Sequence, residues 1–289
     1  MLKKNVIVVV NPISGDIDKA ITLQKVVQFS KQNNIKIGIY TTTGTDDASK
    51  LKLLYATHRP ERIVIIGGDG TVKMVAETMK LEDVILGIIP AGSANGLALD
   101  LDLILSEEEN LQIAFFNPYK EIDLILINDK ISIHLSDIGI NAALIKNYEE
   151  GSLRGKWGYA LHAITTWVDF DTPFVSTIEV NHRTFDCTAS MIGIANSKRY
   201  GSGVEINPIG IMDDGKFELI LMKNLDLILL GKMFMGITPI DSEDVEIISS
   251  DKATITINTP VSFQMDGEYC GEVTRLSISI LQKAMKVAI

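Results

Sequence analysis

Hydrophobic positions along the first 130 residues change repeatedly between two patterns. Unbroken apolar runs, such as VIVVV at residues 6–10, are typical of strands that are covered on both faces. Between the runs, apolar residues recur at helical spacing, as they do from Ile17 to Phe29, and Asp16 or Asp18 can cap that helix. This alternation predicts an α/β domain at residues 1–130, with helices on both faces of a parallel sheet. Further strands are expected within residues 35–43, 62–68 and 84–92, and further helices at 48–55 and 71–80.

The pattern changes after about residue 130. Strand-like segments there follow one another directly, and a turn near Asn181 and His182 predicts a β-hairpin. Helical patterns interrupt the strands at residues 156–168 and 225–234. We therefore expect a β-rich second domain at residues 131–289, whose last strand or tail can pack back on the first domain.

The charge of the chain limits its partners. The formal net charge is −10 at pH 7, whereas binding to nucleic acid requires a basic surface. The same charge argues against broad attachment to an anionic membrane. We expect no nucleic-acid partner.

Cysteine content and hydropathy favour a cytoplasmic protein. Cys187 and Cys270 lack the spacing of a metal site or a disulfide framework, which suits a reducing compartment. The apolar run at residues 6–10 is too short for a signal peptide. The most apolar later segment, residues 225–240, contains two charged side chains and is too short to cross a bilayer. We expect no transmembrane anchor.

Three loops of the first domain share a glycine and a hydroxyl side chain directly after a predicted strand. They are NPISG at residues 11–15, GGDGT at 67–71 and PAGSANG at 90–96. Ligands of open parallel sheets bind at this edge, and glycines let backbone N–H groups approach an anion at a helix N-terminus. One such loop is an ordinary turn, but three together favour a phosphate-bearing ligand, although the P-loop and GxGxxG motifs are absent.

Five segments resemble the diacylglycerol kinase catalytic-domain family, which includes bacterial soluble lipid kinases and sphingosine kinases. The resemblance implies a nucleotide-binding α/β domain, a β-sandwich-like second domain and transfer of the γ-phosphate of ATP to a lipid hydroxyl. The segments are VNPISG, GGDGT, PAGSANGLALDL, IMDDGKFELIL and QMDGEY, in the order of the family and over nearly the whole chain.

The resemblance also implies the residues that hold ATP and Mg²⁺. A side-chain oxygen of Asp214 and backbone carbonyls near Ile211 and Lys216 would bind the metal, and oxygen ligands suit this hard ion. On composition alone the same Asp-Asp-Gly segment is a hairpin turn. The nucleotide would be held by Asn11, Pro12, Ser14, Gly15, Thr43 (with Thr42 as the alternative), Gly67, Gly68, Asp69, Gly70, Thr71 and Ser93.

Transfer to a hydroxyl requires a base that takes its proton. The MDGE segment supplies Asp266 and Glu268, and the resembled bacterial kinases assign this role to the glutamate. The sphingosine kinase branch gives it to the aspartate of the glycine turn, which is Asp69 here. All three carboxylates are candidates, with Glu268 first.

The sequence departs from the family at two places. Lys73 and Met74 stand where Asn-Glu is usual, and Asn95-Gly96 replaces Asn-Asp. Three functions therefore remain in view: a lipid kinase that meets its substrate at a membrane surface, a kinase of a soluble substrate such as NAD, and a binding protein without catalysis. Residues 151–170 are either part of an acyl pocket or an ordinary core helix.

Overall fold

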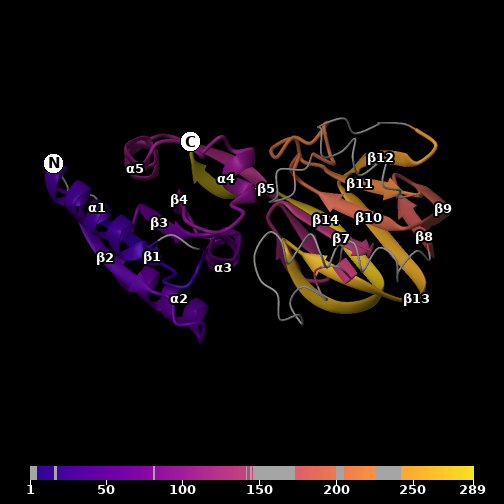
Figure 1. Ribbon diagram of the computed structural model, residues 1–289, viewed down its shortest axis with the longest axis horizontal. Coiled ribbons are helices and arrows are strands. Elements are labelled where there is room, and N and C mark those ends of the chain that lie inside the picture. Colours follow the sequence, from indigo (N-terminus) through magenta and orange to yellow (C-terminus); the bar gives the residue numbers. More distant parts are fainter. Residues whose placement is uncertain are drawn as a thin grey trace. The chain divides into compact units, whose positions relative to one another are not determined.

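The computed structural model describes residues 5–15, 18–80, 82–140, 142–143, 145, 173–199, 205–224 and 242–289. The chain forms two compact units, Met1–Ile122 with Lys283–Ile289, and Asp123–Gln282. The first contains the labelled helices, and the second consists mainly of strands (Figure 1). The helices expected at 156–168 and 225–234, and the candidate acyl segment 151–170, lie outside the described residues.

The first unit contains a parallel sheet. Its strands are in the order β2-β1-β3-β4-β14, and each pair of neighbours is parallel. All these strands therefore end at one edge of the sheet. Their bounds are β1 Asn5–Val10, β2 Lys36–Thr41, β3 Arg62–Gly67, β4 Ile85–Pro90 and β14 Glu268–Ala288, of which only the last residues belong to this unit.

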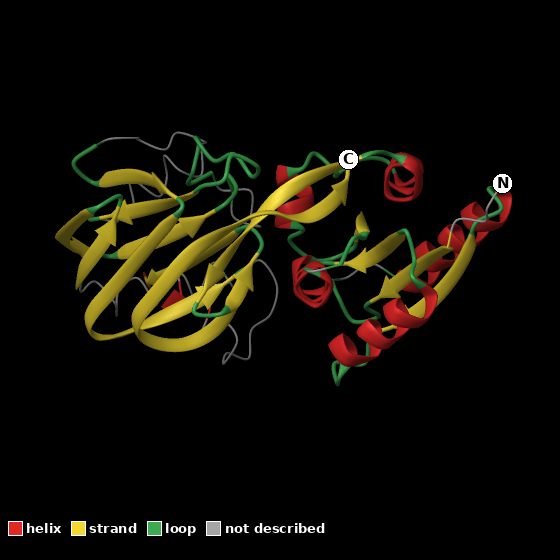
Figure 2. Cartoon of the chain, turned by 180° about the vertical axis from the view of Figure 1, so that it is seen from behind, coloured by secondary structure: helices red, strands yellow, loops and turns green. Residues whose placement is uncertain are grey.

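Helices cover both faces of this sheet (Figure 2). On one face, Val8 of β1 packs in a cluster with Val26 of α1 and Phe115 of α5. The right-handed crossovers that connect the strands place α2 and α3 on the other face, where they contact each other. The α/β prediction is confirmed. The helices are α1 Lys19–Gln32, α2 Asp47–His58, α3 Asp69–Met79, α4 Gly96–Asp100 and α5 Glu107–Phe116.

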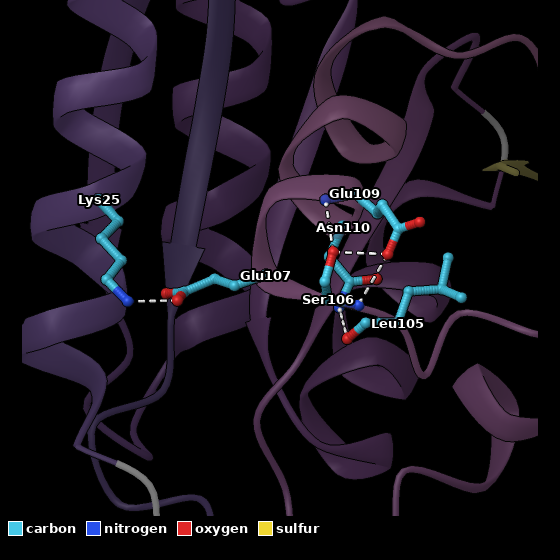
Figure 3. A network of polar contacts seen from close by, with 6 residues as sticks. All are labelled: Lys25, Leu105, Ser106, Glu107, Glu109 and Asn110. Atoms are coloured by element: carbon cyan, nitrogen blue, oxygen red, sulfur yellow. Dashed lines mark hydrogen bonds and ion pairs between the residues drawn. The ribbon is translucent and has the colours of Figure 1, made fainter.

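Helix α5 was not predicted, although its start carries a sequence signal. The Ser106 hydroxyl accepts the N–H of Glu109 at 3.3 Å, and the Glu109 carboxylate accepts the N–H of Ser106 at 3.0 Å, which is a capping box. An ion pair between Lys25 of α1 and Glu107 joins the two helices beside this cap (Figure 3). The spacing Ser-x-x-Glu could have located this helix.

The second unit is antiparallel. Its strands are in the order β12-β11-β10-β7-β13-β14, with β8 and β9 forming a hairpin beside β13 and with β5 pairing with β6. Asn181 and His182 of the hairpin turn both have positive φ, 49° and 61°, as a type I′ turn requires. The β-rich prediction is confirmed. The bounds are β5 Tyr119–Ile127, β6 Lys130–Ser132, β7 Leu135–Gly139, β8 Phe174–Val180, β9 Arg183–Ala189, β10 Met191–Ala195, β11 Phe217–Met222, β12 Val245–Ser250 and β13 Lys252–Met265.

Candidate active site

The three glycine loops meet at the carboxyl edge of the first unit's sheet. A Cβ atom built on Gly15 would lie 2.7 Å from the carbonyl carbon of Gly92, and one on Gly68 would lie 2.9 Å from the Cα of Gly92. Gly15 also has a φ of +57°, which favours glycine. These loops therefore pack backbone against backbone, and this contact requires the glycines.

Asp69 links the second loop to the third. One carboxylate oxygen accepts the N–H of Gly96 at 2.8 Å, and the other accepts the N–H of Leu97 at 3.1 Å. Both N–H groups belong to the first turn of α4, where an anion is favoured by the helix dipole. The aspartate thus holds the two loops together through both of its oxygens.

Asn11 links the first loop to the second. Its side-chain NH₂ donates to the hydroxyl of Thr71 at 3.0 Å, and Thr71 is only 5% exposed. The Ser14 hydroxyl lies 3.2 Å from the carbonyl oxygen of Asn11 and 3.3 Å from that of Ala91, and its one proton can be donated to either. The hydroxyls of Thr71 and Ser14 thus take part in bonds between loops, whereas the exposed candidates of these loops are Pro12, Gly70 and Ser93.

Asn95 closes the third loop, a role that the sequence did not suggest. Its side-chain oxygen accepts the N–H of Gly92 at 2.8 Å, and its NH₂ group donates to the carbonyl of Gly92 at 2.9 Å. Asn95 has a φ of 58°, a conformation that asparagine tolerates better than most residues. The signal that could have indicated this role is local, because Asn95 reaches back only three residues and stands before Gly96 in an Asn-Gly pair.

Thr43 lies after β2 in a separate exposed turn. Asp47 organises this turn by accepting the N–H groups of Thr43 and Gly44 at 2.9 and 2.7 Å, together with the hydroxyl of Tyr40. Partial burial and the bond to Asp47 raise the pKa of Tyr40 to about 12. Burial alone would raise the pKa of Asp47, but these hydrogen bonds together lower it.

In the second unit, the Asp213-Asp214-Gly215 segment forms a turn that a buried carboxylate holds. Asp123 is 1% exposed, and its carboxylate accepts the N–H of Gly215 at 2.7 Å. The N–H of Asp123 in turn donates to the carbonyl of Met212 at 2.7 Å. Asp214 is exposed and accepts the N–H of Lys216 at 3.0 Å. Asp123 was not among the predicted site residues, although a carboxylate inside an otherwise apolar strand is a signal that could have located it.

The oxygen atoms available at this turn are carboxylate and carbonyl oxygens, which are suitable ligands for a hard cation such as Mg²⁺. The exposed Asp214 carboxylate and the backbone at Ile211 and Lys216 are the ligands that the resemblance implied. In the part of the chain that the structure describes, no group of three or more His, Cys, Asp or Glu side chains could hold a metal. A cation here would therefore depend on backbone carbonyls and water besides Asp214.

Asp266 and Glu268 differ in their surroundings. The Asp266 carboxylate is buried and accepts the N–H groups of Ile133 and His134 at 3.1 and 3.0 Å and the hydroxyl of Ser132 at 2.9 Å. Asp266 and Gly267 both have positive φ, 51° and 87°, and form the turn between β13 and β14. Glu268 follows this turn and is exposed.

The chain thus combines a parallel α/β unit, whose glycine loops converge, with an antiparallel β unit. The family model for the diacylglycerol kinase catalytic domain matches residues 5–127, and the model for the YegS C-terminal NAD kinase beta sandwich-like domain matches residues 136–289. The chain belongs to this family of diacylglycerol kinase-like proteins with a YegS-type C-terminal domain. Kinases of this kind are phosphotransferases with an alcohol group as acceptor, and the chain is an enzyme of that class.

Two relatives are similar in sequence to this chain over most of their own length. The "Probable lipid kinase YegS" of Salmonella arizonae is 26% identical over 255 residues, which is 85% of this chain and 84% of the relative. The protein of the same name from Salmonella choleraesuis is 25% identical over 255 residues, again 85% of this chain and 84% of the relative.

Among the described residues, no helix is long and apolar enough to cross a membrane.

Solved structures share the fold. A diacylglycerol kinase structure from Bacillus anthracis has a TM-score of 0.78 at 19% identity and covers 100% of this chain and 97% of its own. A second structure from the same organism has a TM-score of 0.82 at 22% identity, with 100% and 98% coverage. At this identity the likeness extends to the fold alone.

Proposed function

We propose that the protein is an ATP-dependent lipid kinase that transfers the γ-phosphate to a lipid hydroxyl, such as that of diacylglycerol or a sphingoid base. The observation that carries this proposal is the meeting of three glycine loops, which Asp69 and Asn11 connect by hydrogen bonds. Backbone N–H groups gathered at the ends of parallel strands suit a phosphate chain. The family and the names of the relatives support the kinase chemistry.

The nucleotide would lie on these loops. We assign its phosphates to the backbone of the loops at 11–15 and 67–71 and to the exposed hydroxyl of Ser93, with Thr43 as a further contact. We assign Asn11, Thr71 and Asp69 to the positioning of the loops, since their side chains form hydrogen bonds between one loop and another. Catalysis is then largely a matter of holding the phosphates in place.

Mg²⁺ would be held by the Asp214 carboxylate and the carbonyls of Ile211 and Lys216. When bound, it would supply positive charge that offsets the charge of the phosphates. Asp123 fixes the turn that presents these groups.

Glu268 is our candidate for the base that takes the proton of the lipid hydroxyl. It is exposed, whereas Asp266 is buried. Both oxygens of Asp69 and the Asp266 carboxylate accept N–H or O–H groups of other loop residues. We therefore assign Asp69 and Asp266 as positioning residues. The substrate would be met at a membrane surface by a cytoplasmic protein, without attraction to anionic lipid because the net charge is −10.

The test is transfer of the labelled γ-phosphate of ATP to a panel of lipids in neutral vesicles, with NAD as a separate acceptor. We expect a labelled lipid and no labelled NAD, and we expect chelation of Mg²⁺ to abolish transfer. Transfer to NAD alone would favour a soluble-substrate kinase. This is the second candidate, because the second domain matches a family of NAD kinase beta sandwich-like domains. Nucleotide binding without any transfer would identify a catalytically silent protein.

A further inference from the structure

The turn between β13 and β14 is held from inside the second unit. Its two residues, Asp266 and Gly267, both have positive φ, as a type I′ turn requires. The N–H of Asp266 donates to the carbonyl oxygen of Leu135 at 2.9 Å, and the N–H of Gly267 donates to the side-chain oxygen of Gln264 at 2.8 Å. Both backbone N–H groups of the turn are therefore bonded to the protein.

Two further hairpin turns of the same unit have a different environment. Asn128 and Asp129, between β5 and β6, and Asn181 and His182, between β8 and β9, also have positive φ at both positions. All four of these residues are exposed, whereas Asp266 is buried. The turn type alone therefore does not explain why polar side chains are buried beneath the turn between β13 and β14.

Gln264 connects this turn to the interior of the unit. It is buried and lies opposite the buried Asp137 where β13 pairs with β7. Its NH₂ group donates to the Asp137 carboxylate, while its side-chain oxygen accepts the N–H of Gly267. Burial of such groups costs desolvation energy, but groups that are bonded to one another hold a single arrangement. The amide thus fixes Gly267 relative to β7.

The other residue of the turn is held by buried hydroxyl groups. The Asp266 carboxylate accepts the hydroxyl of Ser132 at 2.9 Å, and that hydroxyl lies 2.9 Å from the hydroxyl of Ser136. Both serines are buried. Glu268 follows the turn directly as the first residue of β14, so the backbone that carries the Glu268 side chain is fixed together with the turn.

We propose that Gln264 is a positioning residue of the kinase reaction, which holds the turn so that Glu268 meets the lipid hydroxyl in the geometry that proton transfer requires. This inference rests on the proposed function, because it takes Glu268 as the base. A misplacement of about 1 Å can cost about 100-fold in rate. A rigid turn therefore has a use beside Glu268 that the exposed hairpin turns do not have.

The test combines Gln264→Met and Glu268→Gln in a double-mutant cycle, in which kcat and KM are measured for phosphate transfer from ATP to lipid. We expect Gln264→Met to lower kcat about tenfold, which corresponds to roughly one hydrogen bond, with the KM for ATP unchanged. In the Glu268→Gln background the same change should have no further effect on kcat, because a residue that acts through Glu268 then has nothing to position. A purely structural role would lower kcat by the same factor in both backgrounds.

Amide hydrogen exchange, followed by NMR, reports on the turn without any assay of activity. The N–H of Gly267 should exchange about tenfold faster in Gln264→Met than in the wild type, because it loses its acceptor. Ser176→Ala is the matched control, since Ser176 is another buried polar residue of the second unit and donates to the carbonyl of Cys187 on β9. It should leave both kcat and the exchange at Gly267 unchanged, whatever its effect on the melting temperature.

Three results would overturn the inference. They are equal losses of kcat in the two backgrounds, unchanged exchange at Gly267 in Gln264→Met, and failure of Gln264→Met to fold, which would assign the residue to stability. A wild-type protein that labels no lipid would instead refute the proposed function, and the exchange at Gly267 would still decide whether Gln264 holds the turn.

Discussion

At the scale of single residues, carboxylates of similar appearance in the sequence have different surroundings. Asp69 accepts two backbone N–H groups, Asp266 is buried among N–H and O–H donors, and Glu268 is exposed. The sequence suggested all three as candidates for the base, because it shows residue types and not their partners. Exposure separates them: Asp266 is buried, Asp69 is half-buried, and Glu268 is exposed and therefore accessible to a substrate.

Asp69→Asn tests the role of Asp69. An amide keeps one acceptor oxygen and turns a donor toward the second N–H group, so we expect a destabilisation of about 1 kcal/mol, as for a lost helix cap. Phosphate transfer should fall at least about 100-fold, because two loops lose their connection. Chemical denaturation and the transfer assay measure both effects. Asp102→Asn is the control, since Asp102 is exposed and also has positive φ; wild-type behaviour of Asp69→Asn would refute the role.

Glu218 should make stability depend on pH. Burial raises the pKa of its carboxyl above the ordinary value of 4.5, although hydrogen bonds from Asn207 and Ser249 act in the opposite direction. The folded protein therefore holds the proton more tightly, and stability decreases as the pH rises from about 4.5 through the raised pKa.

Glu218→Gln should remove this dependence. The amide keeps one oxygen that can accept from the NH₂ group of Asn207, and its own NH₂ group can donate to the hydroxyl of Ser249. Melting temperatures between pH 4 and 8 should give a flatter profile than the wild type. Glu179→Gln, at an exposed position, should keep the wild-type slope, and an unchanged slope in Glu218→Gln would contradict the assignment.

At the scale of elements, the glycine loops act as one unit because their backbones touch. The strands before these loops and the helices after two of them could be predicted, since apolar runs and helical spacing depend on local sequence. The contacts between loops could not, because Asn11 and Thr71 are 60 residues apart, and Asp69 and Gly96 are 27 apart. The sequence indicated where the loops are; their mutual hydrogen bonds follow only from the folded sheet.

Gly92→Ala tests the contact between loops. The added Cβ would lie 2.4 Å from the Cα of Gly68, so backbone must move. We expect ADP affinity to fall at least about tenfold, as for a lost hydrogen bond to a charged group. Gly38→Ala is the matched control, because a Cβ there meets nothing within 4 Å. Wild-type ADP affinity in Gly92→Ala would show that the loops need not touch.

Ser106→Ala tests the start of α5. Loss of the capping box should cost about 1 kcal/mol of unfolding free energy at neutral pH. Hydrogen bonds from Ser106 lower the pKa of Glu109, so the part of the box that the ionised Glu109 carboxylate contributes is present above pH 4.5, the ordinary pKa, and is lost as the pH falls through the lowered pKa. The difference between variant and wild type should therefore shrink in acid. A difference that is constant with pH would contradict the capping box.

At the scale of the whole molecule, the two units are joined by two passages of the chain. These lie between Ile122 and Asp123 on β5 and between Gln282 and Lys283 on β14. Composition and periodicity indicated an α/β part and a β-rich part, because each part has its own repeat pattern. The bond between Asp123 and Gly215, 92 residues apart, could not be inferred from either pattern, since it depends on the packing of β5 against a distant turn.

The most direct measurement of the central claim is phosphate transfer from ATP to lipid by wild type and Glu268→Gln, with ADP affinity determined on the same preparations. We expect the wild type to label a lipid and Glu268→Gln to lose at least about 100-fold in kcat, the usual share of a general base. ADP affinity should be equal in both, because Glu268 is assigned to the lipid hydroxyl and not to the nucleotide. Absence of labelled lipid with the wild type, or full turnover in Glu268→Gln, would contradict the account.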